Sequence, residues 1–282
     1  MILRRRPPRR AASLVPNYVV LTLLVIFSLG PLLVLGFNSL KTNAEIGRNP
    51  LGPPLEGLHW ENFPAAWETG EYSVALKNSL IIVVSTVVGV CLVGGTAAYA
   101  LARLRLPGSD FFTMYFLVGT SLPVQLFLVP LYFLWAKLGL VDNPLGLIII
   151  YVALFSPFAA FLLRSYMVAI PSDFEDAARV DGASDWQVFV RVIVPLTWPG
   201  FLTAGLVTGL WAWNEFLFAV TFLHKPEVMT VTISYYNFAG RYGRDWGLTS
   251  AAALIMILPI VALFLALQRQ FIDGLTEGGL KA

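Results

Sequence analysis

The chain has 282 residues, of which 57% are hydrophobic and only 13% are charged, and its mean hydropathy is +0.73. Soluble domains are typically about 45–50% apolar and about 25% charged, so a water-soluble fold of this composition would expose extended apolar surface and aggregate. The composition therefore excludes an ordinary soluble protein and predicts an integral membrane protein.

The net charge of +2 comes from a short basic arm near the N-terminus. This arm holds Arg4, Arg5, Arg6, Arg9 and Arg10. Without it the chain is slightly acidic, which argues against a nucleic-acid-binding face. We interpret residues 1–17 as a cytoplasmic basic arm. A cleavable signal peptide is the alternative, but the apolar run of residues 18–35 is long for one and no A-x-A-type site follows.

Six apolar stretches are long enough to cross a bilayer, which takes about 20 residues. They are Tyr18–Leu40, Ser79–Leu101, Phe111–Leu138, Pro144–Leu163, Pro199–Leu223 and Leu248–Leu267. The third contains Pro123 and Pro130, so we expect it to be kinked or interrupted. The sequence predicts an all-α fold of six transmembrane helices. The arm is followed by a first helix with an external segment (18–78), a core transmembrane domain (79–268) and a cytoplasmic tail (269–282).

Lys and Arg residues set the orientation, because they are more frequent in cytoplasmic loops. With the N-terminus inside, the inner segments (1–17, 102–110, 164–196 and 268–282) hold twelve of the nineteen. This bias and the even number of spans predict that both termini are cytoplasmic. The single cysteine, Cys91, lies in an apolar stretch and is expected to be a small hydrophobic side chain.

Two outer segments, 41–78 and 224–247, are rich in aromatic residues. The first contains Trp60, Phe63, Trp67 and Tyr72, and the second contains Tyr235, Tyr236, Phe238, Tyr242 and Trp246. Trp and Tyr favour the headgroup level of a membrane, so these residues are either interfacial anchors or a docking surface for an external partner.

The inner loop 171–196 has a pattern that predicts two short helices. Ser172 with Glu175, and Ser184 with Gln187, have the spacing of capping boxes. Gly182 suits the left-handed residue that ends a helix, and a second helix would end at Pro195.

Short helices of this kind are marginal in water and need packing to be stable. Apolar residues recur at helical spacing: Phe174, Ala177 and Ala178 on the first helix, and Trp186, Phe189, Val190 and Ile193 on the second. The loop is net acidic, so a partner would present basic residues. An ordinary ordered loop is the alternative, and a DNA-binding helix-turn-helix is disfavoured because its surface would be negative.

The loop resembles the signature of ABC importer permeases, E-A-A-x3-G-x9-I-x-L-P. The matching residues are Asp176, Ala177, Ala178, Gly182, Val192, Val194 and Pro195. The departures are Asp for Glu at 176 and Val at both 192 and 194. The surrounding AARVDGA is similar to the carbohydrate-uptake branch, and Asn78-Ser79, Trp213–Phe216 and the tail from Gln268 to Lys281 resemble the maltose-type permease. The resemblance covers nearly the whole chain and implies the type I ABC importer transmembrane fold.

The resemblance implies that the loop 171–196 couples the permease to a cytoplasmic ATPase subunit dimer. Glu175, Asp176, Ala177, Ala178, Asp181, Gly182 and Pro195 would form this coupling loop. Asp176 would pair with a basic ATPase residue, and Ala177 and Ala178 would fill its cleft. A homologous second permease subunit and an extracytoplasmic solute-binding protein would complete the assembly in the inner membrane of a prokaryote. The chain has no G-x-x-x-x-G-K-[ST] motif, so we expect it to bind no ATP or other cofactor and to be no enzyme.

Candidates for the translocation path are polar residues in or near the spans. They are Asn78, Thr120, Ser121, Gln125, Asn214 and Glu215. Glu215 is also open to interpretation as an interfacial carboxylate. The transported solute would be a sugar or a related polyol. The alternative function is an ion-coupled secondary transporter of a small polar solute, which needs ionisable residues at mid-span. A membrane enzyme is disfavoured because His59 and His224 have no metal-ligand spacing.

Overall fold

The computed structural model describes the backbone of residues 15–104, 106–121 and 123–279. Side chains at 15, 110, 113, 120, 121 and 269–279 lie outside the described part, as do most of the predicted basic arm and the end of the predicted tail. All regular elements in the described ranges are helical, as the all-α prediction requires.

Four helices in the described ranges are long and apolar enough to span a membrane. They are α1 (Val15–Asn38), α4 (Tyr72–Arg103), α7 (Pro144–Val168) and α14 (Trp246–Gly279). They coincide with four of the six predicted spans, although α4, α7 and α14 are longer. A fifth candidate is α11 (Trp198–Asn214) together with the helical stretch Asp185–Leu196, which meets it at a bend of 77°.

The predicted third span is interrupted, as expected, and the count of six transmembrane helices is not confirmed. It consists of α5 (Ser109–Ser121), the 3-10 helix η1 (Val124–Phe127) and α6 (Leu128–Leu138). The interruption falls at Pro123, where it was expected, because proline lacks the amide that would continue the helix. Pro130 is accommodated in the first turn of α6, where the amide would have no helical partner.

The predicted fifth span is also interrupted, contrary to the expected continuous helix to Leu223. α11 ends at Asn214, and the short helix α12 (Leu217–Phe222) starts two residues after Glu215. Glu215 has an extended backbone, with φ −67° and ψ 129°. Its carboxylate accepts hydrogen bonds from the first free amides of α12, which favours a new helix start over continuation.

The chain divides into two compact units, residues 1–66 with 242–254 and residues 67–241 with 255–282. The first contains α1, α2 (Asn43–Arg48), most of α3 (Asn62–Thr69) and the start of α14. The segment that follows α1 folds around Lys41, which is 1% exposed. The Lys41 ammonium donates to the Asn38 side chain and to the carbonyls of Asn49 and Gly52, so the buried charge is well solvated by protein oxygens.

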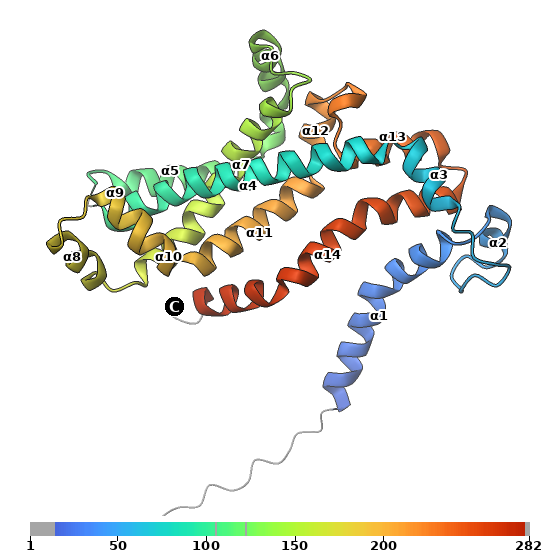
Figure 1. The fold of residues 1–282 in the computed structure, drawn as a ribbon, viewed down its shortest axis with the longest axis horizontal. Helices are drawn as coiled ribbons and strands as arrows, with labels where there is room; N and C mark the ends of the chain where they lie inside the picture. The colour runs from blue at the N-terminus through green and yellow to red at the C-terminus, as the bar shows by residue number, and fades with distance from the viewer. Residues whose placement is uncertain (1–14, 105, 122, 280–282) are drawn as a thin grey trace, which may run out of the picture. The chain divides into compact units, whose positions relative to one another are not determined.

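The second unit is built on α4, α7 and α11, which pack against one another (Figure 1). Small residues let the α4 and α7 backbones approach closely, as is common between membrane helices. A Cβ atom on Gly94 would lie 3.0 Å from Cβ of Ala159 and 3.3 Å from the backbone nitrogen of Ala160. A side chain at this position would therefore require the two helices to move apart by a few tenths of an ångström.

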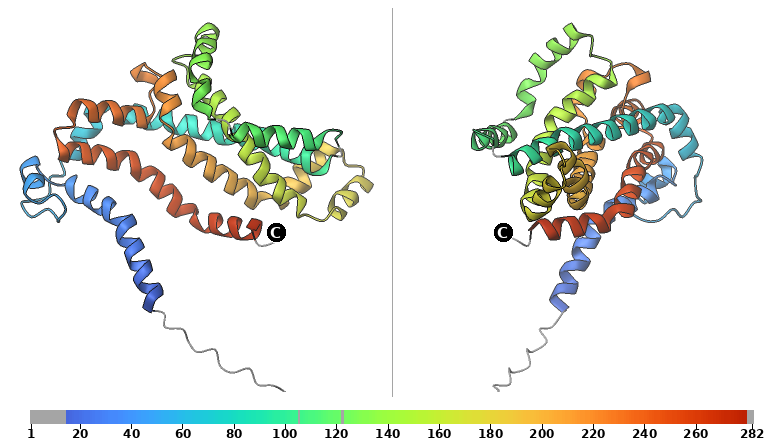
Figure 2. Two further views of the ribbon diagram at one scale, coloured as in Figure 1. Left: turned by 180° about the vertical axis from the view of Figure 1, so that it is seen from behind. Right: turned by 60° about the vertical axis from the view of Figure 1, so that its left-hand side comes forward.

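The two ends of α4 carry different structures, as Figures 1 and 2 show. At its N-terminal end lies α13 (Val231–Tyr242), where Tyr72 and Phe238 are buried and their rings are 6.3 Å apart. These two aromatic residues are thus part of the core, while Trp60 and Trp67 are exposed. At the C-terminal end of α4 lie the helices of the 171–196 loop.

Candidate functional site

The 171–196 loop contains the predicted pair of short helices. The first is α8 (Asp173–Val180). The second runs from α9 (Asp185–Val188) through the π-helical turn η2 (Phe189–Ile193) to α10 (Val194–Leu196). Gly182 between them has φ +84°, the left-handed conformation that was expected.

The capping box predicted at Ser184 and Gln187 is present. The one predicted at Ser172 and Glu175 is absent, so that prediction is wrong. The Ser184 hydroxyl accepts from the Gln187 amide, and the Gln187 side chain accepts from the Ser184 amide. Ser172 makes no side-chain cap to α8. Glu175, the expected partner of Ser172, points elsewhere, because its carboxylate forms ion pairs with two arginines.

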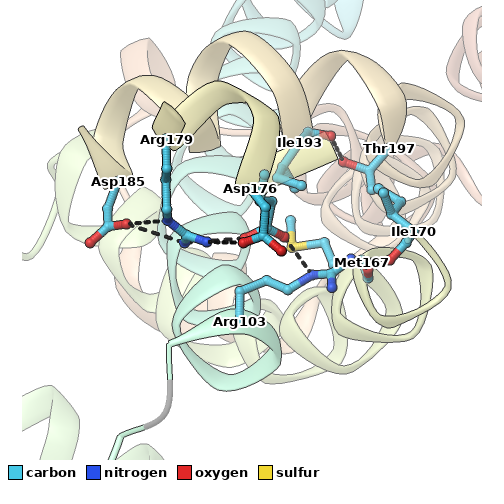
Figure 3. A network of polar contacts seen from close by, with 9 residues as sticks. Arg103, Met167, Ile170, Asp176, Arg179, Asp185, Ile193 and Thr197 are labelled. Atoms are coloured by element: carbon cyan, nitrogen blue, oxygen red, sulfur yellow. Dashed lines mark hydrogen bonds and ion pairs between the residues drawn. The ribbon is translucent and has the colours of Figure 1, made fainter. Parts of the chain in front are cut away.

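Glu175 is 2% exposed and belongs to a charged network with Arg103, Arg179 and Asp185, which are labelled in Figure 3. Its Oε1 is 2.9 Å from Nε of Arg103, and its Oε2 is 3.3 Å from Nη2 of Arg179. Arg179 also lies 3.3 Å from Oδ1 of Asp185 at the start of α9. Partial burial lowers the pKa of Arg179, but its hydrogen bond to Asp185 and the charge of Glu175 outweigh this and raise it. The arginines thus neutralise Glu175 and join α8 to α9.

Pro195 lies one residue before the second helix ends, close to the predicted position. The preceding π-helical turn has a bond from the Val194 amide to the Phe189 carbonyl, which widens the helix just before the proline ring. The chain then bends by 77° at Thr197. The Thr197 hydroxyl, which is buried, donates to the Ile193 carbonyl at 2.7 Å and satisfies an acceptor at the helix end.

The outer surface of the loop is both apolar and acidic. Phe174, Val180 and Trp186 are 51%, 87% and 62% exposed. Ala177 is exposed and Ala178 is half-buried. The predicted apolar face of the second helix is split, because Phe189 and Ile193 are buried while Trp186 and Val190 are exposed. Four exposed carboxylates surround these residues: Asp173, Asp176, Asp181 and Asp185.

Asp176, the acidic residue of the signature, is free to contact a partner. Its side chain is 70% exposed, and its nearest cation, Arg179, is 3.6 Å away. A charge pair of this length on an exposed surface contributes little to stability. Of the two adjacent acids, Glu175 therefore has a partner within the chain and Asp176 faces solvent.

Among the predicted path residues whose side chains are described, Glu215 forms the most side-chain hydrogen bonds. Its Oε2 accepts from the Tyr151 hydroxyl at 2.7 Å, and its carboxylate also accepts from the amides of Phe218 and Ala219. The side chain of the adjacent Asn214 is exposed and donates only to the Leu210 carbonyl in its own helix. Glu215 thus has a structural function at the helix break, whatever else it contacts.

Asn78 and the neighbouring Ser79 hold the segment that leads into α13. The Asn78 amide group donates to the carbonyls of Glu227 and Met229, and the Ser79 hydroxyl accepts from the Val231 amide. Gln125 is exposed in η1, and the side chains of Thr120 and Ser121 lie outside the described residues. Of the path candidates, Asn78 and Glu215 are linked through 227–232, since Thr232 donates to the Glu215 carbonyl.

Two features were not predicted from the sequence. Arg103 was counted only as a topology charge, and no local pattern indicates that it reaches Glu175, more than seventy positions away.

A cavity of about 730 Å³ between α5, α7 and α11 is lined by aromatic residues that include Tyr115, Phe158 and Trp211. These aromatic residues were assigned to membrane spans, and their convergence depends on helix packing. Across the described residues, no group of three or more His, Cys, Asp or Glu side chains could hold a metal ion.

The fold is shared with solved ABC importers. The chain is similar to a bacterial ABC transporter involved in the import of the acidic polysaccharide alginate, with a TM-score of 0.78 and 24% identity over 91% of this chain and 95% of that one. A second structure, of the alginate transporter in complex with its pentasaccharide-bound periplasmic protein, has a TM-score of 0.64 and 14% identity over 92% and 96% of the chains. These likenesses support the predicted importer fold.

Proteins with similar sequences align with this chain over most of its length and most of their own. The probable ABC transporter permease protein YurM of Bacillus subtilis is 34% identical over 94% of this chain and 87% of its own length. The diacetylchitobiose uptake permease NgcG of Streptomyces coelicolor is 32% identical over 96% and 89%. The trehalose transport permease SugB of Mycobacterium tuberculosis is 33% identical over 95% of both.

The family model described as "Binding-protein-dependent transport system inner membrane component" matches residues 91–276. This match covers more than half of the chain and includes α7, the loop 171–196 and α11. The chain is a member of this family, the membrane-embedded permease components of binding-protein-dependent transport systems.

Proposed function

We propose that this permease carries a sugar or a related polyol into the cell, in an importer that uses ATP. Relatives with similar sequences over most of their length are named for transport of trehalose, diacetylchitobiose, arabinooligosaccharides and sulfoquinovosyl glycerol. All of these solutes contain sugar rings. The cavity beside α7 is lined by aromatic residues. Aromatic faces pack on the apolar faces of sugar rings, so this lining suits a sugar.

The observation that carries the coupling part of the proposal is the exposed surface of the 171–196 loop. We infer that a cytoplasmic ATPase subunit binds here. A cleft on that subunit would receive Ala177 and Ala178, a basic residue beside it would pair with the free carboxylate of Asp176, and Gly182 would keep the two loop helices at their tight turn. Exposed Phe174 and Trp186 supply apolar area of the kind that interfaces bury.

The proposal also includes partners on the other side of the membrane. An extracytoplasmic solute-binding protein would dock on segments 41–78 and 224–247, and exposed Trp60, Trp67 and Tyr236 are available there for contacts. A second, homologous permease subunit would complete the translocation path. Energy would come from the ATPase subunits, since this chain lacks a phosphate-binding loop of its own.

We infer an orientation in which the 171–196 loop and both termini are cytoplasmic. The loop lies at the C-terminal end of α4 and α13 at its N-terminal end (Figure 2). α4 is long enough to cross the bilayer, so the two ends belong on opposite sides. The broken segment α5–η1–α6 would then cross once, which gives six crossings in all.

An ion-coupled transporter is the weaker alternative. Proton coupling calls for an ionisable group at mid-span that can change partners. Glu215 already accepts from Tyr151 and from two backbone amides, an arrangement that favours a fixed carboxylate.

The test is solute-stimulated ATP hydrolysis. The chain is co-expressed with the ATPase, second permease and binding protein encoded beside it, and the complex is reconstituted in proteoliposomes. We expect hydrolysis to rise severalfold when the binding protein is loaded with one member of a panel of sugars and polyols, and that solute to accumulate with ATP. Uptake driven by a proton gradient without ATP would overturn the proposal.

A further inference from the structure

Arg103, the last residue of α4, contacts two other elements of the second unit, α7 and α8. Its Nε lies 2.9 Å from Oε1 of Glu175 on α8. Its Nη2 donates to the carbonyls of Met167 and Ile170, at the C-terminal end of α7 and just beyond it. The guanidinium therefore bridges α4, α7 and α8 (Figure 3).

This bridge is well shielded from water. The side chains of Arg103 and Glu175 are 11% and 3% exposed. Removing one member of a buried ion pair leaves the other charge without a partner, which is strongly unfavourable. A displacement of α8 away from α4 is resisted for the same reason.

The second loop helix is tied to the same end of α4. The Phe189 ring in η2 lies 5.0 Å from the Tyr99 ring, one turn before Arg103. Arg179 joins Glu175 on α8 to Asp185 at the start of α9. Both loop helices thus connect to α4, one through an ion pair and the other through an aromatic contact.

We propose that Arg103 is the positioning residue that makes the 171–196 loop move as one body with α4 and α7. The inference rests on the proposed function, in which an ATPase displaces this loop. Arginine suits this position because its extended guanidinium places Nε in an ion pair with the carboxylate while Nη2 donates to the two carbonyls. Lysine keeps the charge but has one nitrogen, whereas here Nε faces the carboxylate and Nη2 serves the two carbonyls. In Arg103→Lys, displacement of the loop would no longer be passed to the core helices.

The experiment compares Arg103→Lys and Glu175→Gln with Arg191→Lys as the matched control. Arg191 is an exposed arginine of the same loop. Two quantities are measured in the reconstituted complex: solute imported per ATP hydrolysed, and disulfide cross-linking of Val180→Cys to a cysteine on the ATPase, in a Cys91→Ala background. Val180 is 87% exposed, so it reports docking of the loop.

For Arg103→Lys we expect the cross-link to persist while solute imported per ATP falls about tenfold, a size common for coupling between sites. Arg191→Lys should match the wild type in both. Wild-type import per ATP in Arg103→Lys would overturn the inference. Loss of the cross-link in step with import would also overturn it, since Arg103 would then only maintain the fold of the loop.

A second measurement separates this inference from the proposed function. Hydrogen exchange is recorded on the full chain in detergent, without any partner. We expect the α8 amides to exchange about tenfold faster in Arg103→Lys and in Glu175→Gln, because local opening of α8 becomes easier, while α4 is unchanged. If the wild type neither binds an ATPase nor responds to solute, the proposed function fails on its own. If exchange in α8 is the same in the variants and the wild type, Arg103 does not position the loop, whether or not the proposed function holds.

Discussion

The carboxylates of Glu175 and Glu215 both have partners within the chain, and the two sets of partners differ in kind. Glu175 is neutralised by two arginines, whereas Glu215 accepts from a hydroxyl and from amides at a helix start. In both cases one partner is distant in sequence, Arg103 for Glu175 and Tyr151 for Glu215, and the others lie three or four residues further along the chain. The adjacent Asp176, in contrast, is 70% exposed and has only a long ion pair to Arg179, so its carboxylate remains accessible to solvent.

Gly182→Val tests the turn between the loop helices. Gly182 has φ +84°, and a side chain in the left-handed region costs about 1–2 kcal/mol, more when it is β-branched. We expect Gly182→Val to insert normally in the membrane but to lose transport and uncouple ATP hydrolysis. Gly182→Asn is the control, since asparagine tolerates this conformation. Normal transport by the valine variant would count against the coupling role of the loop.

Glu215→Ala tests whether this carboxylate supports the structure or the path. Three donors would lose their acceptor, and each buried unsatisfied group costs about 1–3 kcal/mol. We expect a clearly lower unfolding temperature in detergent for Glu215→Ala and little change for Asn214→Ala, whose one side-chain bond lies within its own helix. If Glu215→Ala unfolds like the wild type yet loses transport of one solute only, the residue instead lines the path.

At the scale of the elements, the second unit depends on the close approach of α4, α7 and α11. Glycines of α4 meet neighbouring helices directly: a Cβ atom on Gly95 would lie 2.8 Å from the Phe201 ring, and one on Gly94 would meet the α7 backbone. In a membrane, helices associate through such packing contacts because lipid is as apolar as the side chains. The helix interface is therefore intolerant of added volume.

Gly94→Val should separate α4 from α7. The neighbours of the new side chain are Cβ of Ala159 and the α7 backbone, which cannot rotate away, and overpacking of this kind costs about 1–3 kcal/mol. We expect a lower unfolding temperature for Gly94→Val, measured in detergent by loss of monodisperse protein on heating. Gly36→Ala in α1 provides the comparison, since a Cβ atom there has nothing within 4 Å. Equal stability of the two variants would show that the α4–α7 contact is looser than described.

At the scale of the whole molecule, membrane orientation determines which surface meets which partner. The loop 171–196 and the outer segments 41–78 and 224–247 must lie on opposite sides if ATP hydrolysis inside is to drive uptake from outside. Each of these regions has exposed side chains, so chemical labelling of cysteines placed there can test the membrane orientation.

The labelling experiment uses single cysteines in a Cys91→Ala background and a membrane-impermeant maleimide. Trp60→Cys should react in intact spheroplasts, whereas Val180→Cys should react only after the membrane is opened. The wild-type residues are 60% and 87% exposed, so accessibility is not limiting at either position. Reaction of Val180→Cys in sealed spheroplasts would place the loop outside and remove the ATPase from the proposal.

The sequence by itself determined the membrane class, the approximate position of each apolar stretch, the break at Pro123 and the turn at Gly182. These follow from composition, local periodicity and backbone sterics, which act over a few residues. The family signature in the loop also needed no structure, because its residues are consecutive or closely spaced.

Only the tertiary structure decided what the charged side chains do. Ser172 and Glu175 have the spacing of a capping box, yet Glu175 turns to Arg103 and Arg179 because a buried carboxylate gains more from two cations than from one amide. Likewise Glu215 ends α11 because Tyr151 and the amides of α12 lie within its reach. Such choices depend on which groups the fold brings together, and local sequence patterns do not contain that information.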